Sequence, residues 1–144
     1  MPADQMRGAA VFEKNCTVCH QMQGVGAKIG PDLSGIGQQP RETLLVQILD
    51  PSRQVLPDFV AYNAETKNGE SYVGFIAKES PEAVTLRRAN ESDITLKRSE
   101  LKALTSQGKS LMPDGLEAAM TEQDVADLIE FLRRPDRTLF TQSK

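Results

Sequence analysis

The chain has 144 residues, which is enough for one domain with a buried core. Its 17 Lys and Arg residues against 20 Asp and Glu give a net charge of −3 and a pI of about 5.2, so a nucleic-acid partner is not expected. No apolar run is long enough to span a bilayer, and the first residues, Met1-Pro2-Ala3-Asp4, lack the charged and apolar regions of a signal peptide.

Gln5 to Asn15 is predicted to form the first helix. Gly8 and Phe12 are four residues apart and therefore lie on one helical face. A glycine inside a helix costs about 1 kcal/mol relative to alanine, so Gly8 suggests either a weak point or the close approach of another helix. Met6, on the same helix, is expected in the core.

The next segment, Cys16-Thr17-Val18-Cys19-His20, has the C-x-x-C-H pattern of c-type haem attachment. Two thiols can bind both haem vinyl groups from one turn, and His20 then becomes a proximal iron ligand. A thioredoxin-like pair would need a βαβ context, and a zinc site would need about four ligands, whereas the chain has two Cys and one His in total. A surface disulfide beside an incidental His is the remaining alternative to one covalent haem c.

A haem also fits the composition, because aromatic residues make up only 5% of the chain and Trp is absent. A buried porphyrin would supply the missing apolar bulk, and its propionates would make the protein more acidic. Covalent haem attachment normally takes place outside the bacterial cytoplasm. We therefore expect a periplasmic or otherwise extracytoplasmic protein whose numbering starts at a mature or excised domain.

Residues 21–39 are rich in glycine and are predicted to form a loop. Within it, Gly30-Pro31-Asp32-Leu33 is expected to pack on the haem through Gly30, Pro31 and Leu33. The Pro31 carbonyl is a plausible acceptor for the Nδ1–H of His20, although Pro-Asp is also common in ordinary turns.

Pro40 is expected to begin a second helix at position N1, and Asp50-Pro51 to end it. Its apolar face would consist of Leu44, Leu45, Ile48 and Leu49. Arg41 and Arg53 flank this helix and are candidates for contacts with the haem propionates, although simple surface placement explains them equally well.

Residues 58–98 differ in composition and predict a small antiparallel meander of about four strands. The strands are Phe59–Thr66, Ser71–Lys78, Ala83–Arg87 and Asp93–Lys97, with an Asn68-Gly69 hairpin turn and a turn over Ala89–Ser92. Its basic residues indicate either a docking patch or, as we favour, a solvated face with charged edges. The basic residues are Arg87, Arg88, Lys97 and Arg98.

After the meander, Ser99–Leu104 is predicted as a short helical turn and residues 106–115 as a loop. The last helix begins at Thr121, with Asp124 three residues later. Its apolar positions, Val125, Leu128, Ile129 and Leu132, follow helical spacing. Pro135 ends the helix, and the tail beyond it is expected to be frayed.

The sixth iron ligand has to be a residue other than His20, which is the only histidine. Met22 is too close to His20 in sequence to reach the opposite haem face. Met112 lies far from His20, in a predicted loop before a proline, and is preferred; Met120 is the fallback. A thioether stabilises Fe(II) and raises the reduction potential relative to nitrogen ligation.

Together these motifs resemble class I cytochrome c, in the order helix, C-x-x-C-H, G-P-D-L, helix, M-P and a closing D-L-I-E-F-L helix. The resemblance implies that Gly8 and Phe12 pack on Leu128 and Phe131, that Pro31 accepts from His20, and that Met112 is the sixth ligand. With the β-rich insertion, the chain is similar to the haem-binding domain of dehydrogenase-like proteins in Planctomycetes and Verrucomicrobia. The motifs shared with that domain are L-x-x-I-L-x-P-S over 45–52 and S-x-M-P over 110–113.

The sequence thus predicts a single monohaem domain over 1–144, with a haem core at 5–57 and 99–134 and a β-rich insertion at 58–98. The expected fold is a mainly α cytochrome c fold with a small antiparallel sheet, α+β overall. The expected function is single-electron transfer between protein partners, without enzymatic activity. Two alternatives stay open: a haem enzyme or gas- or peroxide-binding domain with a dissociable Met112, and a haem module that docks to a larger dehydrogenase or oxidase.

Overall fold

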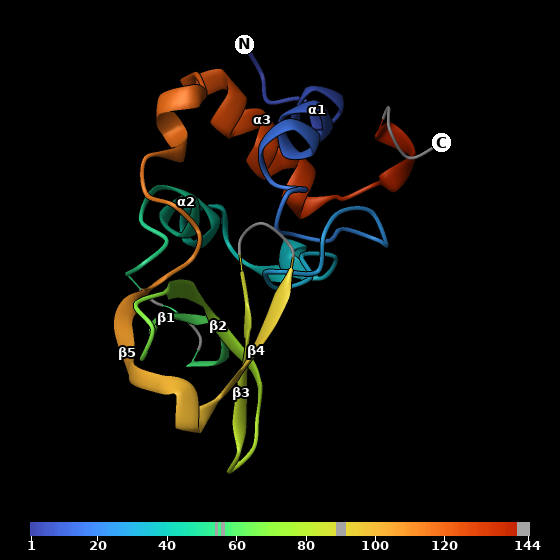
Figure 1. Ribbon diagram of the computed structural model, residues 1–144. Helices are drawn as coiled ribbons and strands as arrows, with labels where there is room; N and C mark the ends of the chain where they lie inside the picture. The colour runs from blue at the N-terminus through green and yellow to red at the C-terminus, as the bar shows by residue number, and fades with distance from the viewer. Residues whose placement is uncertain (54, 56, 89–91, 141–144) are drawn as a thin grey trace. The chain divides into compact units, whose positions relative to one another are not determined.

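The computed structural model describes residues 1–53, 55, 57–88 and 92–140. They divide into two compact units, which we call the helical unit (1–50 and 114–144) and the sheet unit (51–113) (Figure 1). Three α-helices and a five-stranded antiparallel sheet occur within these described ranges, so the fold is α+β. The predicted turn over Ala89–Ser92 lies, except for Ser92, outside the described residues.

The first helix, α1 (Gln5–Asn15), has the predicted bounds, and the Asp4 side chain caps it by accepting from the Arg7 N–H. Gly8 marks a close helix contact, because a Cβ at this position would overlap the carbonyl oxygen of Asp127 and lie 2.8 Å from the Cβ of Phe131. The expected placement of Met6 in the core is wrong: its exposed fraction is 66%. Met6 lies on the face of α1 that points away from this contact.

The last helix, α3 (Glu122–Arg133), begins with the predicted capping box between Thr121 and Asp124. The Phe131 ring on this helix lies 5.5 Å from the Phe12 ring, which confirms the predicted packing of Phe12 on α3. The prediction of a frayed tail is wrong for residues 135–140. Phe140 is 2% exposed and lies 5.7 Å from Phe12 and 5.4 Å from Phe131, ring to ring. The buried aromatic ring holds this end of the chain in the core.

Helix α2 (Arg41–Leu49) buries Leu44 and Ile48. Pro40 is its N-cap residue and not position N1 as predicted, because its ψ of 154° is extended. No helix in the described part of the chain is both long and apolar enough to cross a membrane.

The sheet unit contains β1 (Val60–Thr66), β2 (Ser71–Glu79), β3 (Ala83–Arg87), β4 (Asp93–Lys97) and β5 (Leu101–Ser110), in the order β4-β3-β2-β1-β5. The Asn68-Gly69 turn is present, with Gly69 at a φ of +90°. The four-stranded antiparallel meander predicted over 58–98 is confirmed as β1–β4. The fifth strand, β5, was not predicted, and the loop predicted over 106–115 is wrong for 106–110, which belong to β5. A 3₁₀ turn spans only Arg98–Glu100 and leads directly into β5. The sequence of β5 hides it, because apolar residues do not alternate regularly along this strand.

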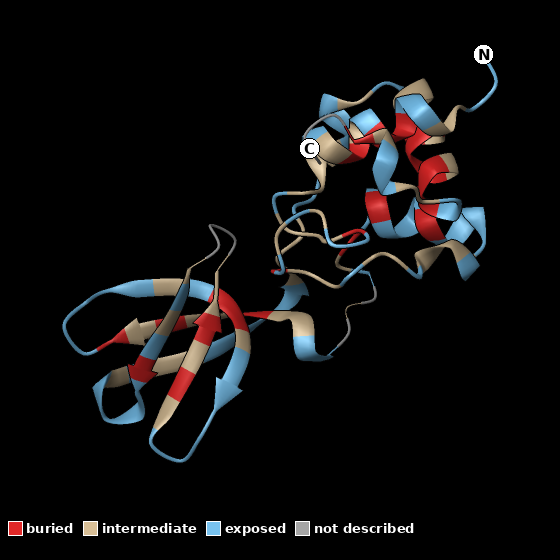
Figure 2. Ribbon diagram, turned by 90° about the vertical axis from the view of Figure 1, so that its right-hand side faces the viewer, coloured by how far each residue is buried: buried red, intermediate tan, exposed pale blue. Residues whose placement is uncertain are grey.

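The sheet is strongly curled. β4 and β5 lie at opposite edges, yet only three residues separate them in sequence. In a flat sheet, edge strands four spacings apart would be separated by about 19 Å, but the connection from Lys97 to Leu101 reaches at most about 14 Å. All five strands therefore enclose a common apolar interior, whose buried members are Ala64, Val84, Leu86 and Leu96 (Figure 2).

Two of the predicted basic residues, Arg87 and Arg98, form ion pairs within the sheet unit. Arg87 bonds Asp93 at 2.9 Å and lies over the Phe75 ring, and Arg98 bonds Glu79 at 2.9 Å. These pairs favour the interpretation of the basic residues as a solvated sheet face.

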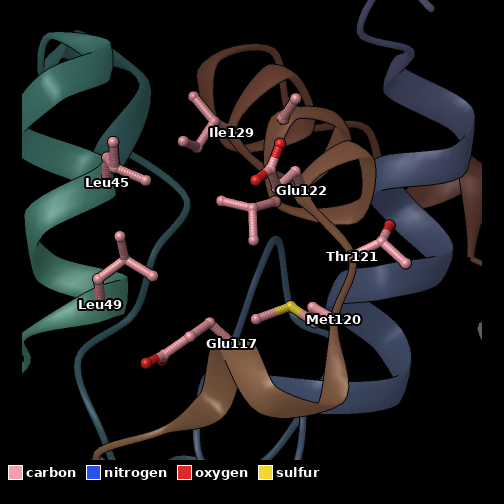
Figure 3. Close-up of a pocket in the computed structure, with 9 residues that line it drawn as sticks. Leu45, Leu49, Glu117, Met120, Thr121, Glu122 and Ile129 are labelled. Carbon is pink, nitrogen blue, oxygen red and sulfur yellow. The ribbon is translucent and has the colours of Figure 1, made fainter.

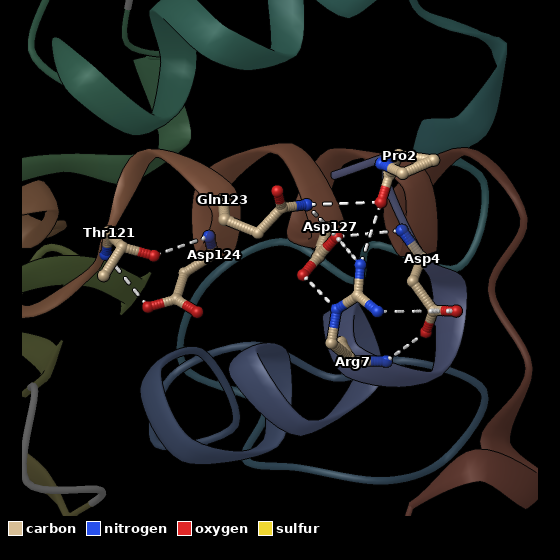
Figure 4. A network of polar contacts seen from close by, with 7 residues as sticks. All are labelled: Pro2, Asp4, Arg7, Thr121, Gln123, Asp124 and Asp127. Atoms are coloured by element: carbon tan, nitrogen blue, oxygen red, sulfur yellow. Dashed lines mark hydrogen bonds and ion pairs between the residues drawn. The ribbon is translucent and has the colours of Figure 1, made fainter.

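A polar network joins the start of the chain to α3 (Figure 4). The Asp127 carboxylate, only 1% exposed, accepts hydrogen bonds from the Arg7 guanidinium at 2.9 and 3.2 Å, from the Asp4 N–H at 2.8 Å and from the Gln123 amide at 2.9 Å. Burial raises the pKa of Asp127, but the bonds from Arg7, Gln123 and Asp4 outweigh burial and hold that pKa below its usual value. The network fastens the beginning of α1 to the helix against which Gly8 packs.

Candidate haem-attachment site

The C-x-x-C-H segment forms one helical turn at the end of α1. The Cys16 N–H donates to the Phe12 carbonyl at 2.8 Å, and the His20 N–H donates to the Cys16 carbonyl at 2.8 Å. Both cysteines are free thiols. The turn therefore places Cys16, Cys19 and His20 together without a disulfide, as haem attachment requires.

His20 makes the contact that the sequence predicts with Pro31. Its Nδ1 lies 2.8 Å from the Pro31 carbonyl oxygen. Because a carbonyl only accepts, Nδ1 carries the proton and Nε2 keeps its lone pair for a metal. Gly30 permits this geometry, since a Cβ there would lie 2.8 Å from Cε1 of His20.

The ionisable groups of the turn are neutral at pH 7. Burial, with a smaller effect of the Cys19 charge, raises the pKa of Cys16 to about 12. Burial also raises the pKa of Cys19. Burial lowers the pKa of His20, and the hydrogen bond to Pro31 opposes this shift only in part. A neutral imidazole is the form that binds iron.

The loop after His20 folds back onto the turn. Gly30 N–H donates to the Cys19 carbonyl at 2.6 Å and Ala27 N–H to the Thr17 carbonyl at 2.9 Å. Gly26, at a φ of +109°, leaves room for the His20 carbonyl oxygen, which a Cβ would overlap. The sequence showed a glycine-rich loop but could not single out Gly26, because its partner is a backbone atom.

These residues fit a covalently bound haem c. The donor set is two free thiols and one imidazole with its Nε2 available, and glycine replaces larger residues where the loop meets the imidazole. In the part of the chain that the structure describes, no group of three or more His, Cys, Asp or Glu side chains is placed to bind another metal ion.

The other residues that were predicted to contact the haem, Leu33, Arg41 and Arg53, lie in both units. Leu33 is half-buried against the core of the helical unit. Arg41, also in that unit, bonds Glu130 at 2.8 Å, which occupies part of its guanidinium. Arg53 is exposed and belongs to the sheet unit. Nothing in these positions assigns either arginine to a propionate.

The methionines differ in their surroundings. Met22 is fully buried in the core of the helical unit. Met112, half-buried in the sheet unit, has its N–H bonded to the Ser110 hydroxyl at 3.0 Å.

Met120 lines an apolar groove of about 470 Å³ between α2 and α3, which we call the α2–α3 groove (Figure 3). Leu45, Leu49, Val125 and Ile129 also line this groove, whereas Cys16, Cys19 and His20 do not. The side chain of Met120 therefore lies in a site apart from the C-x-x-C-H turn.

Comparison with known proteins agrees with this geometry. The family model described as cytochrome c matches residues 5–71. Residues 5–71 of the chain are thus similar to a cytochrome c domain. This matched part includes α1, the C-x-x-C-H turn, the Pro31 contact and α2, and it ends at the start of β2, before Met112 and α3.

A curated relative shows the same similarity. The chain is 35% identical over 60 residues to a cytochrome c-553-like protein from Synechocystis sp.. These residues are 41% of this chain, and the chain spans only 56% of the relative. The similarity to cytochrome c across the C-x-x-C-H turn implies covalently bound haem c as the cofactor of this chain.

Proposed function

We propose that this chain is a monohaem c-type cytochrome that carries single electrons, with His20 and Met112 as the axial ligands. The hydrogen bond from His20 Nδ1 to the Pro31 carbonyl carries the proposal, because it orients the imidazole and leaves Nε2 available. When bound, the haem supplies a one-electron couple between Fe(III) and Fe(II). No catalytic residue is assigned, since His20 and Met112 would together leave no position on the iron open to a substrate.

The residues around His20 would tune this couple. Pro31 holds the proton on Nδ1, which increases the basicity of the ligand nitrogen. Cys16 and Cys19 would form the two thioether links, and Gly30 allows the loop to close on the imidazole. A dry environment around these groups favours the less charged state of the iron centre.

Met112 is proposed as the sixth ligand on three grounds. It stands far from His20 in sequence, and its backbone is fixed by Ser110 and stiffened by the following Pro113. Met22 is fully buried in the core, and Met120 lines the α2–α3 groove. The resemblance to class I cytochrome c points to the same residue.

The setting of this activity is part of the proposal. We infer an extracytoplasmic location, because covalent haem attachment is normally completed there. The partners would be an electron donor and an electron acceptor, with a dehydrogenase or oxidase as one of them. The sheet unit supports assignment to the haem-binding domain of Planctomycetes and Verrucomicrobia dehydrogenase-like proteins that the sequence resembles.

The test compares the parent holoprotein with Met112→Ala, and with Met120→Ala as the matched control. We expect a six-coordinate low-spin spectrum with a methionine–iron band that only Met112→Ala loses. The reduced parent should bind carbon monoxide slowly and reduce an outer-sphere acceptor such as ferricyanide. A high-spin parent that binds carbon monoxide rapidly would contradict the proposal and favour a gas-binding or enzymatic haem.

A further inference from the structure

We propose that Gln23 is a positioning residue that links the C-terminal segment 135–140 to the contact between His20 and Pro31. The inference rests on the proposed role of His20 as an iron ligand. Its observations are independent of that role, because they concern the loop after the C-x-x-C-H turn and the segment that lies against it.

Gln23 is bonded to the C-terminal segment by three hydrogen bonds. Its side-chain Nε2 donates to the Pro135 carbonyl at 3.2 Å, and its Oε1 accepts from the Arg137 N–H at 2.9 Å. The Arg137 guanidinium donates to the Gln23 carbonyl at 3.2 Å. One residue of the loop thus contacts two residues more than 110 positions later in the chain.

The segment that holds Gln23 is itself fixed. Phe140 is buried between Phe12 and Phe131, with its ring nearly parallel to that of Phe12 at an interplanar angle of 20°. Asp136 caps the short turn before it by accepting from the Thr138 N–H at 2.9 Å. The segment therefore provides a rigid support for the loop.

Gln23 has a φ of +49°, the one positive φ at a non-glycine residue in the described part of the chain. A residue in this region costs of order 1 kcal/mol and persists when its surroundings hold it. Here the three bonds to residues 135–137 hold it. A strained residue supported in this way commonly belongs to a functional site.

On its other side, Gln23 holds the turn that presents the Pro31 carbonyl. The Gln23 N–H donates to the Ser34 hydroxyl at 2.7 Å, and that hydroxyl donates to the Asp32 carboxylate at 2.6 Å. The Leu33 N–H donates to the Gln21 carbonyl at 2.8 Å. Continuous hydrogen bonds therefore run from residues 135–137 through Gln23 and Ser34 to the residue next to Pro31.

Removing Gln23 should therefore weaken the bond from His20 to Pro31. Gln23→Gly removes the two side-chain bonds, to the Pro135 carbonyl and from the Arg137 N–H, and leaves the bond to the backbone carbonyl. Glycine also tolerates the positive φ, so the variant is expected to fold. In the reduced holoprotein, we expect the His20 Nδ1–H to exchange with solvent at least tenfold faster than in the parent. The reduction potential should rise, because a less basic imidazole stabilises Fe(III) less.

The controls separate positioning from general stability. Ser34→Ala should reproduce the faster exchange, and Ser34→Thr, which keeps the hydroxyl, should restore the parent value. Gln38→Ala, at an exposed position of the same unit, should change neither quantity. The proposal is overturned if Gln23→Gly and Ser34→Ala lower the melting temperature but leave both the exchange rate and the potential at parent values.

Failure of the proposed function would look different. If His20 does not ligate iron, the parent itself would lack the low-spin spectrum, whatever the variants do. A low-spin parent with unchanged Gln23→Gly and Ser34→Ala would reject only the positioning role.

Discussion

The two units are built on different kinds of core. In the helical unit, Phe12, Phe131 and Phe140 meet across more than 110 residues of sequence. In the sheet unit, consecutive strands fold around small and aliphatic residues such as Ala64 and Leu86. The difference indicates that the geometry of the C-x-x-C-H turn depends on contacts between the two ends of the chain. The sheet unit depends on pairing between consecutive strands, together with the longer-range pairing of β1 with β5. The sheet unit contributes only Met112 to the proposed ligands.

The largest effect should follow from Gly8→Val, which tests the helix contact directly. The added side chain would overlap the Asp127 carbonyl and crowd Phe131, so α1 and α3 would have to separate. We expect a loss of about 3 kcal/mol in the free energy of unfolding of the holoprotein, measured by urea titration. Gly35→Ala is the control, since a Cβ there meets no atom within 4 Å, and it should change the stability by less than about 0.5 kcal/mol. Equal effects of the two changes would remove the argument for a close α1–α3 contact.

Leu86→Ala tests the other core. Leu86 is fully buried in the curled sheet, and its truncation should cost about 2.5 kcal/mol. Amide exchange should accelerate in β2, β3 and β4 while the amides of α1 and α3 stay protected. Equal acceleration in the helices would show that the two units do not unfold separately.

Asp127→Asn should change how stability depends on pH. The pKa of Asp127 is below its ordinary value in the folded chain. The ionised carboxylate therefore adds to the free energy of unfolding above the unfolded pKa of about 3.9, and this stabilisation is lost as the pH falls through the folded pKa. We expect a loss of about 1.5 kcal/mol at pH 7 and a smaller difference between variant and parent below pH 4. Urea titrations at pH 7 and pH 3 measure this, and a constant difference at both would contradict it.

Arg98→Ala should have the smallest effect. Arg98 and Glu79 form an ion pair on the surface of the sheet, with exposed fractions of 38% and 58% for their side chains. Such pairs contribute no more than about 1 kcal/mol. Because we interpret this face as solvated, the variant should also transfer electrons at the parent rate. A large drop in that rate would restore the docking-patch interpretation.

Features with local signals were predictable from the sequence. The capping box at Thr121, the Asn68-Gly69 turn and the bounds of α1, β3 and β4 follow from neighbouring residues. The Cys16–His20 turn is itself a local motif. The contact between His20 and the Pro31 carbonyl was predictable because Gly30-Pro31-Asp32-Leu33 is a recognisable motif.

Features that depend on distant partners were not predictable. β5 forms through pairing with β1, some forty residues earlier, and its own sequence lacks a regular alternation. The ordered segment 135–140 depends on a place for Phe140 between two aromatic rings. Gln23 gave no signal, because the fold alone brings its partners Ser34, Pro135 and Arg137 to it.

The most direct test of the central claim is an NMR spectrum of the reduced holoprotein with ¹³C-labelled methionine methyl groups. A methionine bound to haem iron has its methyl resonance displaced far from the others by the porphyrin ring current. We predict one displaced resonance in the parent, its retention in Met120→Leu and its loss in Met112→Leu. Retention in Met112→Leu, or its absence in the parent, would contradict His20–Met112 ligation.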